Sequence, residues 1–240
     1  MKNVTLLALD TATEACSVAL LRGGEKTHLA QFAQREHTKH ILPMVDEILA
    51  QAGITLHQVD ALVFGRGPGS FTGVRIGAGI AQGLAFGADL PVIPVSNLAA
   101  MAQAAYAKYQ AENVLTAIDA RMSEVYFAQW QAQKVRSDFG EFLAWQPIIA
   151  EQVCSPSNVI EQVTQQHHEN AVLAGTGWAA YPELNDANLG KATEITLPSA
   201  LYMLDLALPK WFAGETISPL EIEPIYLRNE VTWKKLPGRE

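Results

Sequence analysis

The sequence predicts an α/β protein made of two related lobes, each built on a mixed sheet. Three strand-like runs follow one another between residues 4 and 32, and helices alternate with short apolar strands over 38–109. A second series of strands and helices begins near residue 114. Antiparallel neighbours and helix-linked parallel strands occur together, so we expect each sheet to be mixed. We place the lobes at residues 1–108 and 109–240, and leave open whether the final segment returns to the first lobe.

The first lobe is expected to begin with three strands joined by turns. The runs 4–10, 16–22 and 26–32 are rich in apolar and β-branched residues, and Thr11-Ala12-Thr13 and Gly23-Gly24 separate them. Short connections of this kind join antiparallel neighbours. We therefore expect the first three strands of this lobe to pair antiparallel, each with the next.

Helices and parallel strands then alternate through the rest of this lobe. Apolar residues recur at helical spacing from Ile41 to Leu49, which predicts a helix over 38–52 that Gly53 ends, with Pro43 near its first turn. The further elements expected here are a strand at 61–65, a small-residue helix to about residue 88, a strand at 92–95 and a helix at 96–109.

The second lobe repeats this alternation less clearly. The residues at 124–131 alternate between apolar and polar, which is typical of a strand with one buried face. No low-complexity tract or Pro/Ser-rich linker marks the boundary between the lobes, which falls near 105–112. The elements expected in this lobe are strands at 114–119, 124–131 and 172–174 and helices at 158–166 and 201–212.

Composition limits the classes of function. The net charge of −8 argues against a surface that binds nucleic acid by counterion release alone, so we expect any RNA contact to be shared with a partner. Cys16 and Cys154 are far apart and form no Cys-x-x-Cys, which favours a reducing cytoplasm over a disulfide scaffold. The least charged stretch is too short to span a bilayer, so no membrane association is expected.

A glycine-rich loop, Gly65 to Ser70, joins a predicted strand to the small-residue helix. Backbone N–H groups at such a helix N-terminus favour a phosphate or carboxylate. Asp10 at the end of the first strand could hold a metal-bound phosphate, or simply cap its own turn. Asp119 occupies the matching strand end, but Arg121 stands where a nucleotide clamp would need a glycine.

We expect either no cofactor or weak, vestigial nucleotide binding. The turn Gly175-Thr176-Gly177 could lie against a bound adenosine, or it could simply connect a strand to a helix. The candidate nucleotide-binding residues are Asp10, Thr11, Thr13, Gly67, Gly69, Ser70, Asp119, Gly175 and Gly177.

The small-residue helix carries two rows of glycine. Gly73 and Gly77 share one i, i+4 row, and Gly79, Gly83 and Gly87 share a neighbouring row. Each interior glycine costs about 1 kcal/mol relative to alanine, so the five together cost about 5 kcal/mol of helix propensity. Either the helix packs very tightly on its own sheet, or one row also meets a helix of another subunit.

The histidines offer weaker signals. His37 and His40 are three residues apart, but no further ligand stands at a convincing spacing for a metal site. His167 and His168 are better explained as a solvated helix end. No His-Glu-x-x-His, Gly-x-Ser-x-Gly or Walker-type motif occurs, so the sequence offers no nucleophile with an evident base.

Several motifs together resemble one family. They are Asp10-Thr11-Ala12-Thr13, His37-Thr38-Lys39-His40, Gly67-Pro68-Gly69-Ser70-Phe71-Thr72-Gly73, Ile118-Asp119-Ala120-Arg121 and Pro224-Ile225-Tyr226-Leu227-Arg228. In this combination they resemble the TsaB (YeaZ) family of threonylcarbamoyladenosine biosynthesis on tRNA. The resemblance runs nearly end to end and implies a two-lobe actin-like ATPase or ribonuclease-H-like fold.

The resemblance also implies a role. It suggests a cytoplasmic, non-catalytic partner of the paralogous TsaD transferase, which moves threonylcarbamoyl to the adenosine next to the tRNA anticodon. The resemblance further implies that the nucleotide-hydrolysing TsaE completes the set, that the chain forms a homodimer in the absence of TsaD, and that it contacts tRNA only through the complex. The partner or dimer surface implied comprises His37, His40, Ile41, Met44, Val45, Ile48, Thr72, Arg75, Ile76, Gly79, Ile80, Gly83 and Leu84.

Two alternatives remain open at this point. The catalytic paralogue resembles this chain around 94–101 but carries a His-x-x-x-His metal pair where this chain has Asn97 and Met101. Neither residue replaces imidazole as a ligand, which disfavours a glycoprotease-like metallopeptidase. Arg121 and the short second lobe disfavour an ATP-dependent phosphotransferase of the sugar-kinase kind.

Overall fold

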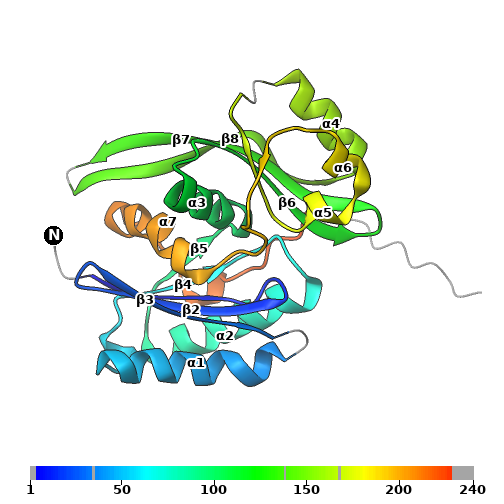
Figure 1. The fold of residues 1–240 in the computed structure, drawn as a ribbon. Coiled ribbons are helices and arrows are strands. Elements are labelled where there is room, and N and C mark those ends of the chain that lie inside the picture. Colours follow the sequence, from blue (N-terminus) through cyan, green and yellow to red (C-terminus); the bar gives the residue numbers. More distant parts are fainter. Residues whose placement is uncertain (1–3, 34–35, 138, 167–168, 229–240) are drawn as a thin grey trace, which may run out of the picture.

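The structure, a computed structural model, describes residues 4–33, 36–137, 139–166 and 169–228. His167 and His168, interpreted above as a solvated helix end, lie outside these residues. Within the described residues the chain forms two sheets of five strands, with the orders β3-β2-β1-β4-β5 and β10-β9-β6-β7-β8 (Figure 1). This is the two-lobe α/β arrangement that the sequence predicts.

The first sheet is mixed, as predicted. β1 and β2 pair antiparallel, as do β2 and β3, while β4 and β5 continue parallel to β1. The predicted antiparallel pairing of the first three strands is therefore confirmed. The strands are β1 (Thr5–Asp10), β2 (Ala15–Arg22), β3 (Glu25–Phe32), β4 (Ala61–Gly65) and β5 (Val92–Val95).

Helices cover both faces of this sheet, because β1 is apolar on both sides. Leu7 and Leu9 pack with α1 (His37–Ala52) and α2 (Phe71–Ala88), whereas Leu6 and Ala8 pack with α7 (Ala200–Ala213). Helix α7 thus brings a late segment of the chain onto the first sheet (Figure 1). The 3₁₀ helices η1 (Leu56–Gln58) and η2 (Pro219–Glu221) complete this part.

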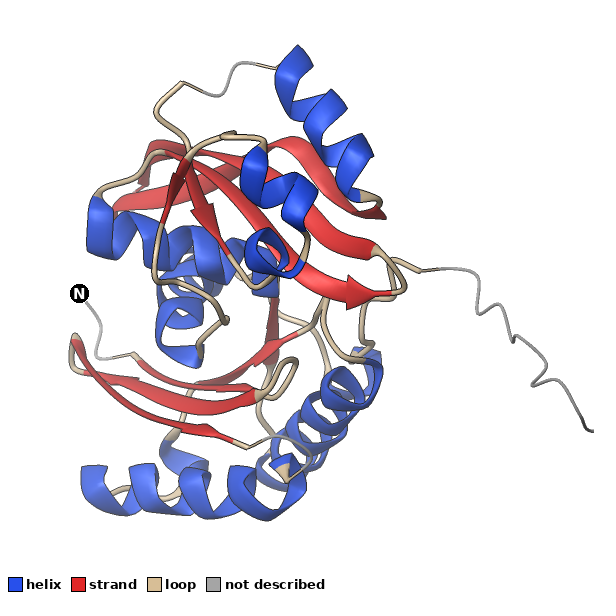
Figure 2. Cartoon of the chain, turned by 45° about the vertical axis from the view of Figure 1, so that its right-hand side comes forward, coloured by secondary structure: helices blue, strands red, loops and turns tan. Residues whose placement is uncertain are grey.

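The second sheet lies above α3 and α7 in Figure 1, so these two helices separate the sheets. Helix α3 (Asn97–Tyr109) packs on the inner face of the second sheet, and α4, α5 and α6 cover the outer face, as Figure 2 also shows. The remaining elements are β6 (Asn113–Arg121), β7 (Glu124–Ser137), β8 (Gly140–Cys154), β9 (Val172–Ala174), β10 (Lys191–Ala192), α4 (Pro156–Gln165), α5 (Gly177–Ala180) and α6 (Pro182–Asp186).

Three details differ from the sequence predictions. Strand β8 was not predicted, and β7 extends to Ser137 rather than residue 131, because the outer half of this hairpin is mostly exposed and lacks an apolar rhythm. Pro43 lies inside α1, beyond the first turn. In the described part of the chain, no helix has both the length and the apolar character needed to cross a membrane.

Candidate functional site

The glycine-rich loop packs tightly against the turn that follows β1. A Cβ atom on Gly69 would overlap the Ala12 carbonyl oxygen, and one on Gly73 would overlap that of Thr11. The Thr11 hydroxyl donates a hydrogen bond to the Gly73 carbonyl at 2.8 Å. The Ser70 N–H donates to the Ala12 carbonyl at 2.7 Å. These glycines therefore permit close approach of two backbone segments within the lobe.

Asp10 lies beneath this loop and is almost completely buried. Its Oδ1 accepts a hydrogen bond from Nδ2 of Asn97 at 2.7 Å, and Oδ1 of Asn97 accepts one from the Gly67 N–H at 2.8 Å. Burial raises the pKa of Asp10 to about 6, although the Asn97 hydrogen bond favours the charged form. Within the described structure Oδ2 has no hydrogen-bond partner. The carboxyl group is held inside the protein.

A pocket of about 350 Å³ opens between the lobes next to this turn. Of the nine candidate nucleotide-binding residues, it gathers Thr13, Gly69, Ser70 and Asp119. The other five, Asp10, Thr11, Gly67, Gly175 and Gly177, do not line it. Further lining residues are Ala12, Glu14, Phe71, Ile118, Ala120, Arg121, Tyr126, Thr176, Ala180 and Arg228.

Arg121 lines the second-lobe side of this pocket and pairs with carboxylates on both sides of it. Its backbone has φ +61°, the left-handed conformation that favours glycine, yet it carries a long side chain. One guanidinium nitrogen lies 3.0 Å from Oδ2 of Asp119, and the other lies 3.7 Å from Glu14 across the pocket. Asp119 also accepts hydrogen bonds from the Arg121 N–H and the Tyr181 hydroxyl, each at 2.8 Å. With Asp10 buried and Asp119 paired, neither carboxylate is free to hold a metal-bound phosphate in this conformation.

The glycines after β9 serve packing. Gly175 has φ +114°, and a Cβ there would overlap the Ala117 carbonyl oxygen. A Cβ on Gly177 would lie 2.9 Å from the side chains of Ala117 and Val125. The plain strand-to-helix connection accounts for both glycines, and Thr176 between them lines the pocket.

The candidate interface residues of α1 are mostly in the core. Ile41, Met44, Val45 and Ile48 are buried against the first sheet. His37 is also buried, with Nε2 2.6 Å from the Thr13 carbonyl oxygen. His40 is half-buried, with Nε2 3.6 Å from a Glu36 carboxylate oxygen. In this conformation these side chains give α1 little open contact surface.

The candidate residues of α2 divide into two sets. Thr72, Arg75, Gly79 and Gly83 are exposed, whereas Ile76, Ile80 and Leu84 are half-buried. A Cβ built on Gly79, Gly83 or Gly87 meets nothing within 4 Å, while one on Gly77 would lie 2.8 Å from Oγ1 of Thr11. Tight packing on the lobe itself is thus confirmed for the Gly73 and Gly77 row only. The other row is an open helix face.

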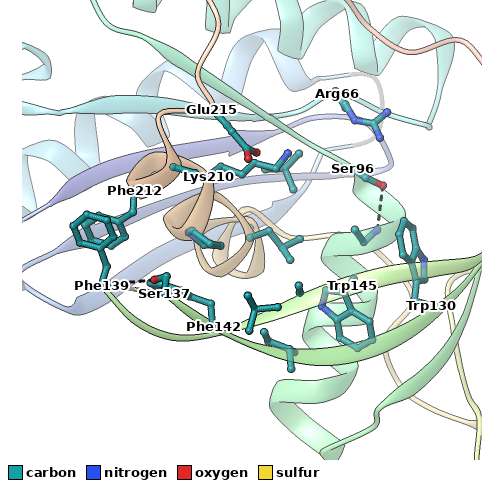
Figure 3. A pocket seen from close by; sticks show the side chains of 18 residues that line it. Arg66, Ser96, Trp130, Ser137, Phe139, Phe142, Trp145, Lys210, Phe212 and Glu215 are labelled. Atoms are coloured by element: carbon teal, nitrogen blue, oxygen red, sulfur yellow. Dashed lines mark hydrogen bonds between the residues drawn. The ribbon is translucent and has the colours of Figure 1, made fainter.

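A second pocket, which sequence analysis missed, lies under the β7–β8 hairpin (Figure 3). Its volume is about 700 Å³, and it includes Phe139, Phe142, Trp145 and Phe212. The available signal was the run of large apolar residues at 139–145, which interrupts an otherwise polar stretch. The pairing of this run with α7, about 60 residues later, required the fold.

Comparisons with known proteins agree with the resemblance. The profile of the TsaD family, described as tRNA N6-adenosine threonylcarbamoyltransferase, matches residues 29–210. A protein of Haemophilus influenzae is 69% identical over 240 residues, all of both chains, and one of Escherichia coli is 49% identical over 98% of this chain and 99% of its own. Both are named tRNA threonylcarbamoyladenosine biosynthesis protein TsaB.

A solved structure, YeaZ from Pseudomonas aeruginosa, matches with a TM-score of 0.81 and 42% identity, covering 93% of this chain and 100% of its own. The two five-stranded mixed sheets within the described residues, with helices between and outside them, agree with the actin-like, ribonuclease-H-like fold that the resemblance implied. The chain therefore belongs to the TsaB (YeaZ) family.

Proposed function

We propose that this protein is a non-catalytic accessory subunit for threonylcarbamoyladenosine formation on tRNA, which binds and positions the transferase TsaD. The name shared by its relatives supports the pathway, and the match to the TsaD profile supports common ancestry with the transferase. TsaE is the further partner, a homodimer forms when TsaD is absent, and tRNA is reached only through the complex. We place this assembly in the cytoplasm.

The open glycine row on α2 carries the proposal. Gly79, Gly83 and Gly87 lower helix propensity, and none of the described residues places an atom within 4 Å of a Cβ built at these positions. Glycine on a helix surface lets a second helix approach closely, and the half-buried Ile76, Ile80 and Leu84 beside the row add apolar contact area. A helix of TsaD, or of a second copy, is the partner that this face fits.

The surroundings of Asn97 and Met101 support the absence of catalysis. Asn97 is fully buried and joins Asp10 to the loop after β4, so its side chain is already engaged. Met101 is fully buried among the residues that pack α3 on the second sheet. Neither side chain reaches an open site where it could act on a substrate.

The test is complex formation with purified TsaD, followed by gel filtration and calorimetry. Gly79→Leu and Gly83→Leu place bulk on the open face without disturbing the fold, so we expect at least a hundredfold weaker binding. Ala107→Leu, at an exposed position of α3, is the matched control and should bind normally. Loss of binding confined to the two glycine variants supports the assignment, and unchanged binding in both contradicts the helix surface. Failure of the wild-type chain to bind TsaD contradicts the proposed function itself.

A second measurement tests inactivity and the vestigial pocket. The isolated chain should form no threonylcarbamoyladenosine when given tRNA and threonylcarbamoyl adenylate. Calorimetry with ATP and magnesium should show no micromolar binding, because Arg121 pairs with Asp119 in the pocket. Micromolar affinity accompanied by hydrolysis would instead support a phosphotransferase.

A further inference from the structure

The pocket under the β7–β8 hairpin is a separate site, which shares no lining residue with the pocket between Asp119 and Ser70. No residue of α1 or α2 lines it either, so it is independent of the proposed partner surface. Its volume of about 700 Å³ lies within the range of small-molecule sites. The hairpin, α3, α7 and the loop after β4 contribute its walls (Figure 3).

One side of this pocket is aromatic and offers ring faces rather than polar edges. Trp145 donates its indole N–H to Oε1 of Gln103 at 2.9 Å, and Trp130 donates its own to Oγ1 of Thr116 at 3.0 Å. With both donors satisfied, the indoles can only offer apolar contact to a ligand. Phe139 stacks on Phe212 with ring centroids 4.6 Å apart and planes 9° apart, which closes one end with a flat wall.

The opposite side carries hydrogen-bond donors that the described part of the chain leaves without a partner. Arg66 pairs through Nη2 with Glu151 at 2.8 Å, but its Nη1 is buried without a partner among the described residues. Among the residues that the structure describes, the Lys210 ammonium group donates one hydrogen bond, to the Pro94 carbonyl at 3.0 Å, although it has three hydrogens to donate. Figure 3 shows both side chains on the side of the pocket that faces Phe142 and Trp145.

The charges around these donors favour an anion. Burial, and then the nearby Arg66 cation, lower the pKa of Lys210. Glu151 is already engaged by Arg66 and by the Ser96 hydroxyl. Glu215, the other carboxylate facing Lys210, is exposed at the rim, where water screens it. Two partly buried cations that have further N–H donors to offer are best satisfied by an incoming negative group.

We propose that this pocket binds a small amphipathic anion, with its acid group at Arg66 and Lys210 and a planar apolar body against the aromatic wall. An aromatic carboxylate, sulfonate or phosphate has this chemistry. A neutral ligand would leave Nη1 of Arg66 unpaired, and an inorganic anion would leave the aromatic wall uncovered, so both parts of the ligand are required.

The probe is 8-anilinonaphthalene-1-sulfonate, an aromatic sulfonate, with the uncharged N-phenyl-1-naphthylamine as its matched comparison. Energy transfer from tryptophan to the probe reports binding, and the blocking and charge variants assign it to the pocket that Trp130 and Trp145 line. We expect one sulfonate per folded chain and at least tenfold weaker binding of the uncharged probe. Lys210→Met keeps the length of the side chain and removes its charge, so it should raise the Kd of the sulfonate about tenfold, the effect of one charge-assisted hydrogen bond.

Two further variants make the test decisive. Ala213→Trp adds an indole at an exposed rim position and should block the site even if Lys210→Met folds poorly. Lys191→Met, in the exposed strand β10, removes a charge far from the pocket and should leave the Kd unchanged. Equal affinity for both probes, or sulfonate binding unaffected by Ala213→Trp, would overturn the proposal. Because complex formation with TsaD is measured separately, this outcome leaves the proposed function untouched.

Discussion

Alanine substitution along α2 should separate its two glycine rows by the sign of their effect on stability. Gly79, Gly83 and Gly87 have helical backbone angles and open space around a Cβ, so alanine there adds only helix propensity. Gly73 faces the Thr11 carbonyl oxygen so closely that a Cβ would overlap it. Alanine at Gly73 must therefore displace backbone.

The expected magnitudes follow from these environments. Each of Gly79→Ala, Gly83→Ala and Gly87→Ala should raise the free energy of unfolding of the monomer by about 0.8–1 kcal/mol. For a chain of this size that corresponds to an increase in Tm of about 2–4 °C each. Gly73→Ala should lower the free energy of unfolding by about 1–3 kcal/mol, since overpacking at a backbone contact outweighs the gain in propensity.

The assay is urea unfolding followed by circular dichroism, at protein concentrations where sedimentation shows monomer. Repeating it at high concentration adds a second measurement, because a homodimer through the open row would be weakened by the same alanines. The stabilisation should then shrink as concentration rises. Destabilisation of the monomer by Gly79→Ala, or a neutral Gly73→Ala, would refute the assignment of the two rows.

Two further predictions concern buried charge. The pKa of Asp10 is about 6 in the folded protein and 3.8 in the unfolded chain, so the native state holds this proton more tightly. The free energy of unfolding should therefore fall by about 3 kcal/mol as the pH rises from about 4 to 6. Asp10→Asn should remove this part of the pH dependence, which urea unfolding at pH 4.5 and 7.5 would detect, and an identical slope in both proteins would contradict it. Glu151→Gln leaves the Arg66 guanidinium without its ionic partner and should lower the free energy of unfolding by about 2 kcal/mol. Thermal melting measures this loss, and Glu161→Gln on the exposed face of α4 is the control that should leave stability unchanged.

Most of the first lobe could be predicted from local signals. The strand at 61–65, the helix ending at Ala88 and the strand at 92–95 have the expected bounds, because short apolar runs are separated by glycine, proline and polar residues. The hairpin of β7 and β8 could not be predicted in this way. Its outer residues, such as Lys134 and Arg136, are exposed, and the two strands pair with each other there without packing on a hydrophobic core. The outer residues of β7 therefore show no regular alternation of apolar and polar side chains that would predict a strand.

The candidate site shows where local reasoning ends. The sequence marks Asp10, Asp119 and three glycine turns as unusual, but their orientation depends on residues far along the chain. Asp10 turns inward because Asn97, 87 residues later, meets it. Gly175 is required by Ala117 on a neighbouring strand. Glycine and aspartate in the sequence mark turns with unusual backbone conformations or close contacts. Only the tertiary structure shows whether the group in contact is a ligand or another part of the protein.

Asn97 connects these observations to the proposed division of labour between paralogues. By the resemblance, the catalytic relative has a metal-binding histidine at this position. Here the side chain accepts from the Gly67 N–H and donates to Asp10, while the Asn97 N–H donates to the Gly67 carbonyl at 3.0 Å. The start of α3, the loop after β4 and the end of β1 are thereby fixed to one another. An amide carries a donor and an acceptor on one carbon atom, so Asn97 satisfies Asp10 and the Gly67 N–H with a single group. Asn97 thus occupies the position of that ligand and also fixes the loop before α2, which agrees with the proposed role of α2 as an interface helix.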